Sequence, residues 1–223
     1  MSDEQIQTAC IARHGNRLDF VDPEWFKTAA RPYDSPLSED GIEQARALGR
    51  RLVPEHIAHI FCSPFLRSVA TAHEVANLLG LHVNVEPGLN EWLNAEWFRG
   101  GIDLLPADAL ASRFASIDPR YAPRWVARFP ESGEAALERA AHTALRLVDE
   151  FPGTILLVGH GASVLGATAG LLGLSGAETQ SLLQPIHYCC LVKLVRSGAQ
   201  GWRLKLNGST DHLRQTDAAV RFV

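Results

Sequence analysis

The sequence is poor in cysteine, and its few cysteines are not spaced for a metal site. The four residues are Cys10, Cys62, Cys189 and Cys190, and they include no C-x-x-C pair. Two of them are adjacent in a run that is typical of a strand. The pattern therefore indicates neither a zinc site nor a disulfide framework, and we expect the thiols to be reduced and buried.

The sequence also has no excess of positive charge. It holds 21 lysines and arginines against 25 aspartates and glutamates, a net charge of -4. Such a chain has no overall positive field to attract nucleic acid or an anionic membrane, so we expect neither as a partner. Any anionic ligand must therefore be bound by a local cluster of cations.

Long uninterrupted hydrophobic runs are missing as well. The longest run, residues 154–174, is broken by a histidine and several glycines, which argues against a membrane span. The first residues, MSDEQIQTACIAR, are acidic where a signal peptide needs basic residues. We expect a cytoplasmic location.

The remaining composition is that of an ordinary globular protein. Hydrophobic residues make up 46% of the 223 residues and charged residues 21%. The length suits one large domain, and we predict a single domain over residues 1–223.

Short apolar runs rich in β-formers alternate with segments of helical periodicity. This alternation is typical of an α/β fold with a parallel or mostly parallel sheet. We predict strands over residues 8–12, 57–62, 81–85 and 154–158, and a late pair at the sheet edge over 188–195 and 202–206. We predict helices from 39 to just before Pro54, over 66–79 and 134–151, and from about 162.

Two stretches, residues 18–37 and 92–132, do not fit this alternation. We expect them to be insertions that cover a site. The second is rich in tryptophan and arginine. Its tryptophans form either a small separate core or the wall of a substrate pocket. They are Trp92, Trp97 and Trp125. Its arginines either meet additional substrate charge or, as we favour for most, face solvent: Arg99, Arg113, Arg120, Arg124 and Arg128.

Residues whose side chains can take part in catalysis or anion binding follow four of the predicted strands. The four segments are RHGNR (13–17), SPFLR (63–67), EPGLNEW (86–92) and VGHGAS (158–163). In open α/β sheets, ligands bind beyond the carboxyl ends of the strands. The sequence therefore predicts that three arginines, two histidines and a glutamate meet at one edge of the sheet.

These segments, together with PLSEDGIEQA (36–45), resemble the histidine phosphatase superfamily, whose fold is phosphoglycerate-mutase-like. The resemblance covers residues 9–167. Within the superfamily, RHGNR, CSPFLRSVATAH and EPGLNEW look most like the phosphatase domain of the ubiquitin-associated and SH3-domain-containing proteins. The resemblance implies a three-layer α/β/α sandwich with a mixed, mainly parallel sheet. It carries over the chemistry of the site, not the partners of those proteins.

The resemblance and the residue chemistry agree on a nucleophile and an anion clamp. His14 matches the nucleophile, and a histidine attacks phosphorus only as neutral imidazole, which its reference pKa of about 6.5 allows. Arg13, Arg67 and Arg17 carry planar forks of donors that suit phosphoryl oxygens. His160, when cationic, completes the clamp, although its GHG setting after a buried strand also fits a core histidine.

Glu91 matches the position of the family's proton donor. It must start protonated, so burial and the neighbouring phosphate have to raise its pKa above the reference value of about 4.3; otherwise activity favours acidic pH. A surface carboxylate is the alternative, since Glu86 and Glu96 lie nearby in sequence. We expect no metal and no other cofactor, because arginines supply the charge.

The other histidines are weaker candidates. His56 and His59 have H-x-x-H spacing but no third ligand nearby, which favours chance over a metal site. His73 is interpreted as structural. We assign His212 a role in packing or in support of the site.

The sequence therefore predicts a metal-independent phosphomonoester hydrolase, a histidine acid-type phosphatase with a phosphohistidine intermediate. Its expected substrate is a phosphorylated small molecule or phosphopeptide, and its oligomeric state stays open. One alternative is a phosphoglycerate-type mutase, although mutase-like members usually follow RHG with a Glu-Ser pair, where this chain has Asn16 and Arg17. The other alternative is a catalytically silent module that binds phosphorylated ligands.

Overall fold

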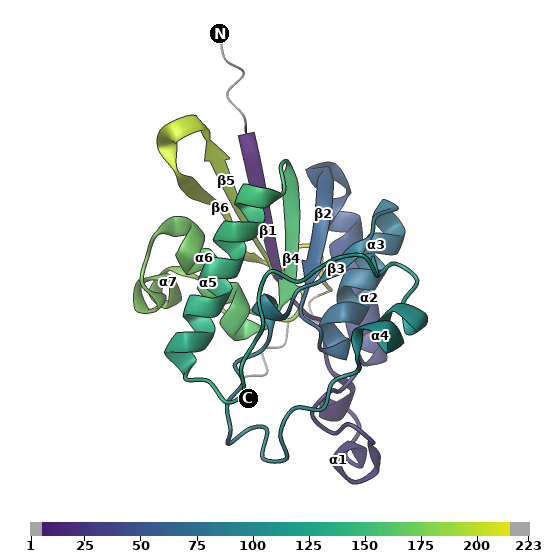
Figure 1. Ribbon diagram of the computed structural model, residues 1–223. Coiled ribbons are helices and arrows are strands. Elements are labelled where there is room, and N and C mark those ends of the chain that lie inside the picture. The colour runs from purple at the N-terminus through teal and green to yellow at the C-terminus, as the bar shows by residue number, and fades with distance from the viewer. Residues whose placement is uncertain (1–5, 215–223) are drawn as a thin grey trace.

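The computed structural model of the chain describes residues 6–214 and contains one six-stranded sheet (Figure 1). The strands are β1 Ile6–Arg13, β2 Ile57–Cys62, β3 Val83–Val85, β4 Thr154–Gly159, β5 Leu191–Ser197 and β6 Trp202–Ser209. Their order across the sheet is β3-β2-β4-β1-β5-β6. The first four strands in this order are parallel, and β5 runs antiparallel to both of its neighbours. The expected mixed, mainly parallel sheet is confirmed.

Helices cover both faces of the sheet, as Figure 1 shows. The α-helices are α1 Trp25–Thr28, α2 Glu39–Leu52, α3 Leu66–Leu79, α4 Ala107–Arg113, α5 Gly133–Glu150, α6 Gly161–Leu172 and α7 Gly176–Leu182. The short 3-10 turns are η1 Leu18–Phe20, η2 Val53–Glu55, η3 Pro87–Leu89 and η4 Gly198–Gln200.

The side chains of β1 show why three layers form. Cys10 and Ala12 pack in the core beneath α2 and α3, whereas Ala9 and Ile11 pack in the core beneath α5 and α6. Successive side chains of a strand point to opposite faces, so a strand that is apolar at every position is buried on both sides. All four cysteines of the chain are buried and unpaired, as expected.

The parallel strands bring their carboxyl ends to one edge of the sheet, at the lower side of Figure 1. The pairing of Arg13 with Gly159, and of Cys62 with Val158, places the ends of β1, β2 and β4 level with one another. The chain segments that leave these ends carry the predicted site residues.

The two predicted insertions behave differently from each other. The first contains only η1 and α1, and it contacts the second through the Arg31–Asp103 ion pair. The second holds α4, a helix that the sequence did not predict. Its residues Phe114 and Ile117 pack on the same core as α2 and α3, and Ile117 forms a bridge with Val83. Part of this segment therefore extends the main core rather than covering a site.

Within residues 6–214, we find no helix with the length and apolar character needed to cross a membrane.

Candidate active site

His14 lies at the end of β1 with its ring held in one orientation. Its Nδ1 lies 2.7 Å from the carbonyl oxygen of Gly15, while its Nε2 is buried and has no hydrogen-bond partner among the described residues. A carbonyl only accepts, so the proton sits on Nδ1 and the lone pair on Nε2. The ring is fully buried, and its centroid lies 5.1 Å from that of His160.

His160 follows β4 and faces both a hydroxyl pair and a carboxylate. Its Nε2 lies 2.9 Å from Ser63 Oγ and 3.3 Å from Ser68 Oγ. Its Nδ1 lies 3.3 Å from Glu91 Oε2. These contacts suit a ring that carries its proton on Nδ1, toward the carboxylate, and accepts a hydroxyl hydrogen at Nε2.

Two arginines bring buried donors without partners to the same place. Arg67, near the start of α3, is 1% exposed, and its Nε and Nη1 have no hydrogen-bond partner among the described residues. Arg13 donates from Nη1 to the carbonyl of Ile186 at 2.9 Å, but its Nε is likewise unpartnered. Buried polar groups in proteins are nearly always paired, so such donors indicate a site for an anion.

Glu91 closes the set from the loop after β3. Its Oε2 lies 3.7 Å from Arg67 Nη2, and its Oε1 accepts a hydrogen bond from the amide of Trp92 at 3.1 Å. The structure thus brings together five of the six residues proposed for the site from sequence: Arg13, His14, Arg67, Glu91 and His160.

The pKa values of the two histidines are lowered. Burial, together with the charges of Arg67 and Arg13, holds the pKa of His14 well below its ordinary value. Burial also lowers the pKa of His160 to about 4, although Glu91 opposes this shift. Both rings are therefore neutral at neutral pH, and a further negative charge in the site would favour the cationic form of His160.

The pKa of Glu91 differs from the expectation made from sequence. Burial acts to raise it, but His160, Arg67 and Arg13 outweigh burial and hold the pKa far below the ordinary value. Burial alone therefore does not produce the expected rise in the protein by itself. Three cationic or hydrogen-donating neighbours stabilise the ionised carboxylate more than its burial destabilises it.

Arg17, the sixth residue, is tied to a carboxylate. Its Nε donates to Asp19 Oδ1 at 2.9 Å, and its Nη2 also pairs with Asp19. Arg17 lines the same cavity as Arg13 and Arg67, but its charge is largely compensated.

Gly15 directly follows His14, where the chain leaves β1. A Cβ built at Gly15 would lie 2.5 Å from the carbonyl oxygen of Gly41 in α2, so the missing side chain allows close packing against that helix.

Sequence reasoning missed a second layer of residues that support the site. Arg139 of α5 donates to the carbonyls of Gly88, Asn90 and Glu91 at 2.8, 3.2 and 3.0 Å, and it pairs with Glu131. No local motif marks these residues, because they act on backbone groups about 50 positions away.

The weaker histidine candidates are structural. His73 contacts Ser116 Oγ at 2.8 Å, and His212 donates to the carbonyl of Cys189 at 2.9 Å. The amide of Cys189 in turn donates to the carbonyls of Arg13 and His14, so His212 supports the end of β1 from a distance.

Metal binding is not the best use of the donor set. Among the described residues, His14, Glu91 and His160 are the only group of three potential ligands within reach of one ion, with ligand atoms within 4.8 Å. Arg13 and Arg67 stand beside this group. Two adjacent guanidinium groups oppose a cation and favour an anion. His56 and His59 do not belong to the group.

The chain is similar to one protein family along most of its length. Residues 9–210 match the histidine phosphatase superfamily (branch 1). An ecdysteroid-phosphate phosphatase from Drosophila melanogaster is 31% identical over 81% of this chain and 29% of its own length. The human ubiquitin-associated and SH3 domain-containing protein A is 33% identical over 81% of this chain and 33% of its own length. The chain thus spans a third or less of these two relatives.

A shorter relative matches along nearly its whole length. A probable phosphoglycerate mutase, GpmB, from Yersinia pestis is 32% identical over 91% of this chain and 93% of its own length. Among solved structures, the ecdysone phosphate phosphatase from Bombix mori in complex with tungstate superposes with a TM-score of 0.75. It is 21% identical and covers 97% of this chain and 98% of that one, which supports the fold.

Proposed function

The chain belongs to branch 1 of the histidine phosphatase superfamily, and from this membership and the site geometry we propose that it hydrolyses phosphate monoesters through a phosphohistidine on His14. Relatives named as phosphatases support the general activity. The specific mechanism is our inference from the residues of the site.

The observation that carries the proposal is the state of the His14 ring. Its Nδ1 is bound to the Gly15 carbonyl, its Nε2 lone pair is uncommitted, and its lowered pKa keeps the ring neutral. A neutral, oriented imidazole with a free lone pair is the form that attacks phosphorus. The charges of Arg67 and Arg13 beside the ring favour attack on an anion.

The arginines hold and stabilise the phosphoryl group. The unpartnered donors of Arg13 and Arg67 gain hydrogen bonds when phosphoryl oxygens enter, and they are already desolvated. They therefore need no reorganisation as charge develops on the transferring group. These arginines supply the charge that a metal ion supplies in other phosphatases, and we assign no metal to the reaction.

Glu91 moves the proton. As Nε2 of His14 bonds to phosphorus, the P–O bond to the leaving group breaks and Glu91 gives its proton to the departing oxygen. A water molecule then attacks the phosphohistidine, Glu91 accepts a proton from that water, and phosphate leaves with neutral His14 restored. The incoming phosphate offsets the cations that lower the pKa of Glu91, and this favours its protonated form.

A mutase is the second candidate, because the probable phosphoglycerate mutase of Yersinia pestis matches over most of both chains. A mutase shares the first step but returns the phosphoryl group to the substrate. The two functions are separated by measuring free phosphate and isomerised product from 3-phosphoglycerate in the same reaction.

The test of the proposal is phosphate release by the wild-type protein and two variants, with p-nitrophenyl phosphate and an alkyl phosphate as substrates. We expect His14→Ala to abolish release and Glu91→Gln to lower kcat for the alkyl phosphate by about 100-fold or more. Activity should survive dialysis against a chelator. Binding of phosphate esters without any hydrolysis would instead identify a silent binding module.

A further inference from the structure

A cavity of about 800 Å³ opens beside the phosphate clamp. Arg13, Arg67 and Glu91 line it, so it is continuous with the place that we assign to the phosphoryl group. A phosphate alone is far smaller than this space. Pockets of roughly 300–1,000 Å³ enclose most of a drug-sized molecule.

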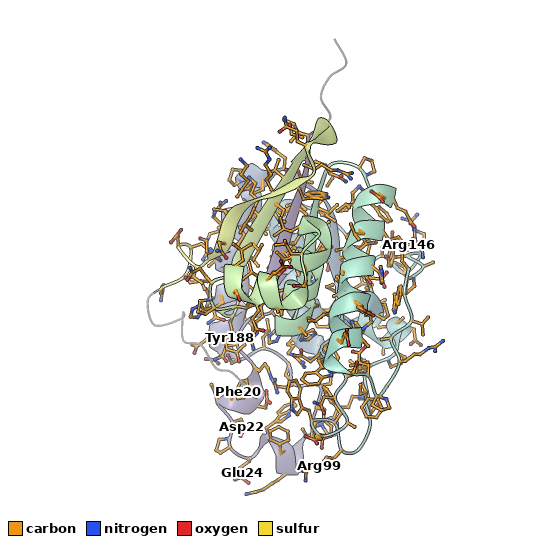
Figure 2. The ribbon with its side chains drawn as sticks, turned by 90° about the vertical axis from the view of Figure 1, so that its left-hand side faces the viewer. Phe20, Asp22, Glu24, Arg99, Arg146 and Tyr188 are labelled. Atoms are coloured by element: carbon orange, nitrogen blue, oxygen red, sulfur yellow. The ribbon has the colours of Figure 1, made fainter. Side chains whose placement is uncertain are left out.

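Aromatic side chains from both insertions form one wall of the cavity. The residues are Phe26, Tyr33, Trp92, Trp97 and Phe98. They form two groups of contacting rings: ring centroids lie 5.6 Å apart for Tyr33 and Phe98, and 5.0 Å apart for Trp92 and Trp97. Figure 2 shows Glu24 and Arg99, from the two insertions, at the same lower end of the molecule. The aromatic wall is therefore assembled where the two insertions meet.

Aliphatic side chains form the other wall. They are Leu137 of α5, Leu165 of α6, and Leu183, Pro185 and Ile186 of the segment after α7. The backbone of this wall is tied to the clamp, because the carbonyl of Ile186 accepts the hydrogen bond from Arg13.

Charge is confined to the clamp. The charged residues that line the cavity are Arg13, Arg17, Arg67 and Glu91, and Asp19 compensates Arg17. None of the five arginines of the second insertion lines it: Arg99, Arg113, Arg120, Arg124 and Arg128. A second anionic group on a substrate would therefore lie against apolar walls without a partner, which is costly.

We propose that the substrate is a small-molecule phosphate monoester whose alcohol or phenol part is large, apolar and uncharged, with two or more rings. This inference rests on the proposed function and specifies its leaving group. Burial of each added ring against the two walls removes apolar surface from water and stabilises the bound substrate.

A phosphopeptide fits the cavity less well. Each residue of a peptide brings an amide and a carbonyl that need partners when buried. The polar side chains of the lining outside the clamp are few, chiefly Gln180 and Gln184. An apolar multi-ring group has no amide or carbonyl that needs a hydrogen-bond partner when buried.

The test compares phenyl, 2-naphthyl and 4-biphenylyl phosphates, whose phenols have similar acidity. We expect KM to be about tenfold lower for the naphthyl and biphenylyl esters, which each have two rings, than for the phenyl ester. We expect kcat/KM for 3-phosphoglycerate, phosphoserine and a phosphotyrosine peptide to be at least 100-fold lower than for the biphenylyl ester. Equal KM values across the aryl series, or preference for an anionic or peptide substrate, would overturn the inference. Failure to hydrolyse any substrate, p-nitrophenyl phosphate included, would overturn the proposed function instead.

Two matched tryptophan variants locate the effect. Trp97 lines the cavity, whereas Trp125 is similarly exposed but stacks on His142 away from it. Trp97→Ala should raise KM for biphenylyl phosphate about tenfold and change that for p-nitrophenyl phosphate less than twofold. Trp125→Ala should change neither. Leu183→Ala, which shortens an aliphatic side chain of the lining, should act like Trp97→Ala. The inference fails if the cavity variants affect both substrates equally, or affect neither.

Discussion

At the level of single residues, the nucleophile and the proton donor of the proposed site have opposite requirements. His14 must be neutral to attack, and its lowered pKa keeps it so down to acidic pH. Glu91 must be protonated to assist the leaving group, yet its pKa is also lowered in the protein by itself. At neutral pH the proton for Glu91 must therefore come from solvent or arrive on a monoanionic substrate.

The catalytic efficiency kcat/KM should therefore fall as pH rises. The second pKa of a phosphate ester is about 6, so the monoanion disappears above that pH. We expect kcat/KM for an alkyl phosphate to fall by up to about tenfold per pH unit above pH 6 and to stay nearly level from pH 6 to 5. The decline should be shallower for p-nitrophenyl phosphate, whose leaving group needs little protonation. A constant kcat/KM from pH 6 to 8 would contradict the low pKa of Glu91.

Arg139 is a positioning residue for Glu91. Its guanidinium donates to three carbonyls of the loop that carries Glu91, and its charge is balanced by the partly buried carboxylate of Glu131. A lysine at this position keeps the charge but lacks the planar fork that reaches several carbonyls at once.

Arg139→Lys should therefore impair the proton donor more than the phosphate clamp. We expect kcat for an alkyl phosphate to fall about tenfold or more, and that for p-nitrophenyl phosphate less than threefold. Arg146→Lys, on the outer face of the same helix (Figure 2), is the matched control and should change neither. An equal loss with both substrates would show that Arg139 supports the fold only.

At the level of the elements, the loop after β1 is held against α2 by two facing glycines, Gly15 in the loop and Gly41 in the helix. A Cβ at Gly41 would lie 2.1 Å from the carbonyl oxygen of Asn16, two residues after His14. In the same helix, a Cβ at Gly49 would make its closest contact at 3.4 Å, with Val75. Gly41 lies in the first turn of α2 and Gly49 in its interior, and of these two only Gly49 has room for a Cβ.

Alanine at these positions should have opposite effects. Gly49→Ala should stabilise the protein by about 0.5–1 kcal/mol through helix propensity. Gly41→Ala should destabilise it by about 1–3 kcal/mol, because backbone must move, and should reduce activity by displacing the His14 loop. Urea unfolding and phosphate release measure both effects. Similar stabilisation by the two substitutions would contradict the close contact.

Asp34 connects the first insertion to α3, the helix that carries Arg67. Its Oδ1 accepts a hydrogen bond from the amide of Leu66 at 2.8 Å, and Oδ2 has no partner among the described residues. Burial raises the pKa of Asp34 to about 6, against the opposing effect of Arg67. Because this pKa is raised in the folded state, the contribution of Asp34 to the stability of the protein is fully present below its unfolded-state pKa of about 4. That contribution is lost as pH rises through about 6.

Asp34→Asn keeps the acceptor for Leu66 and removes the cost of ionisation. We expect the variant to be about 2–3 kcal/mol more stable than wild type at pH 8 and nearly equal to it at pH 4. Asp40→Asn, which removes an exposed carboxylate, should change stability by less than about 1 kcal/mol at either pH. Denaturant unfolding at the two pH values checks this. A gain at pH 8 that persists at pH 4 would rule out ionisation as the cause.

Elements with strong local signals could be predicted from sequence. Helix α3 and strand β2 have the predicted bounds, since Gly80 with φ +69 ends the helix and the apolar run of β2 is short. The short helices α4 and α7 were missed, because seven residues give too little periodicity. The predicted start of β5 was too early, since Cys189 adopts a positive φ and keeps residues 188–190 out of the strand.

At the level of the whole molecule, the site residues could be predicted as a group because parallel strands end at one edge. RHG after β1 and GHG after β4 are local patterns, and topology brings them together. The support of Glu91 by Arg139, and the meeting of Tyr33 with Phe98 from separate insertions, depend on tertiary packing. No local spacing in the sequence indicates these contacts. The lowered pKa of Glu91 could not be predicted either, because it depends on charges that only the folded chain brings together.

The central claim is that the phosphoryl group passes through His14, and a rapid chemical quench tests it most directly. Enzyme mixed with a ³²P-labelled substrate and quenched in base should carry label on His14 that is stable in base and lost in acid. His14→Ala should carry none. Steady release of phosphate by the wild-type protein without any labelled His14 would contradict the account.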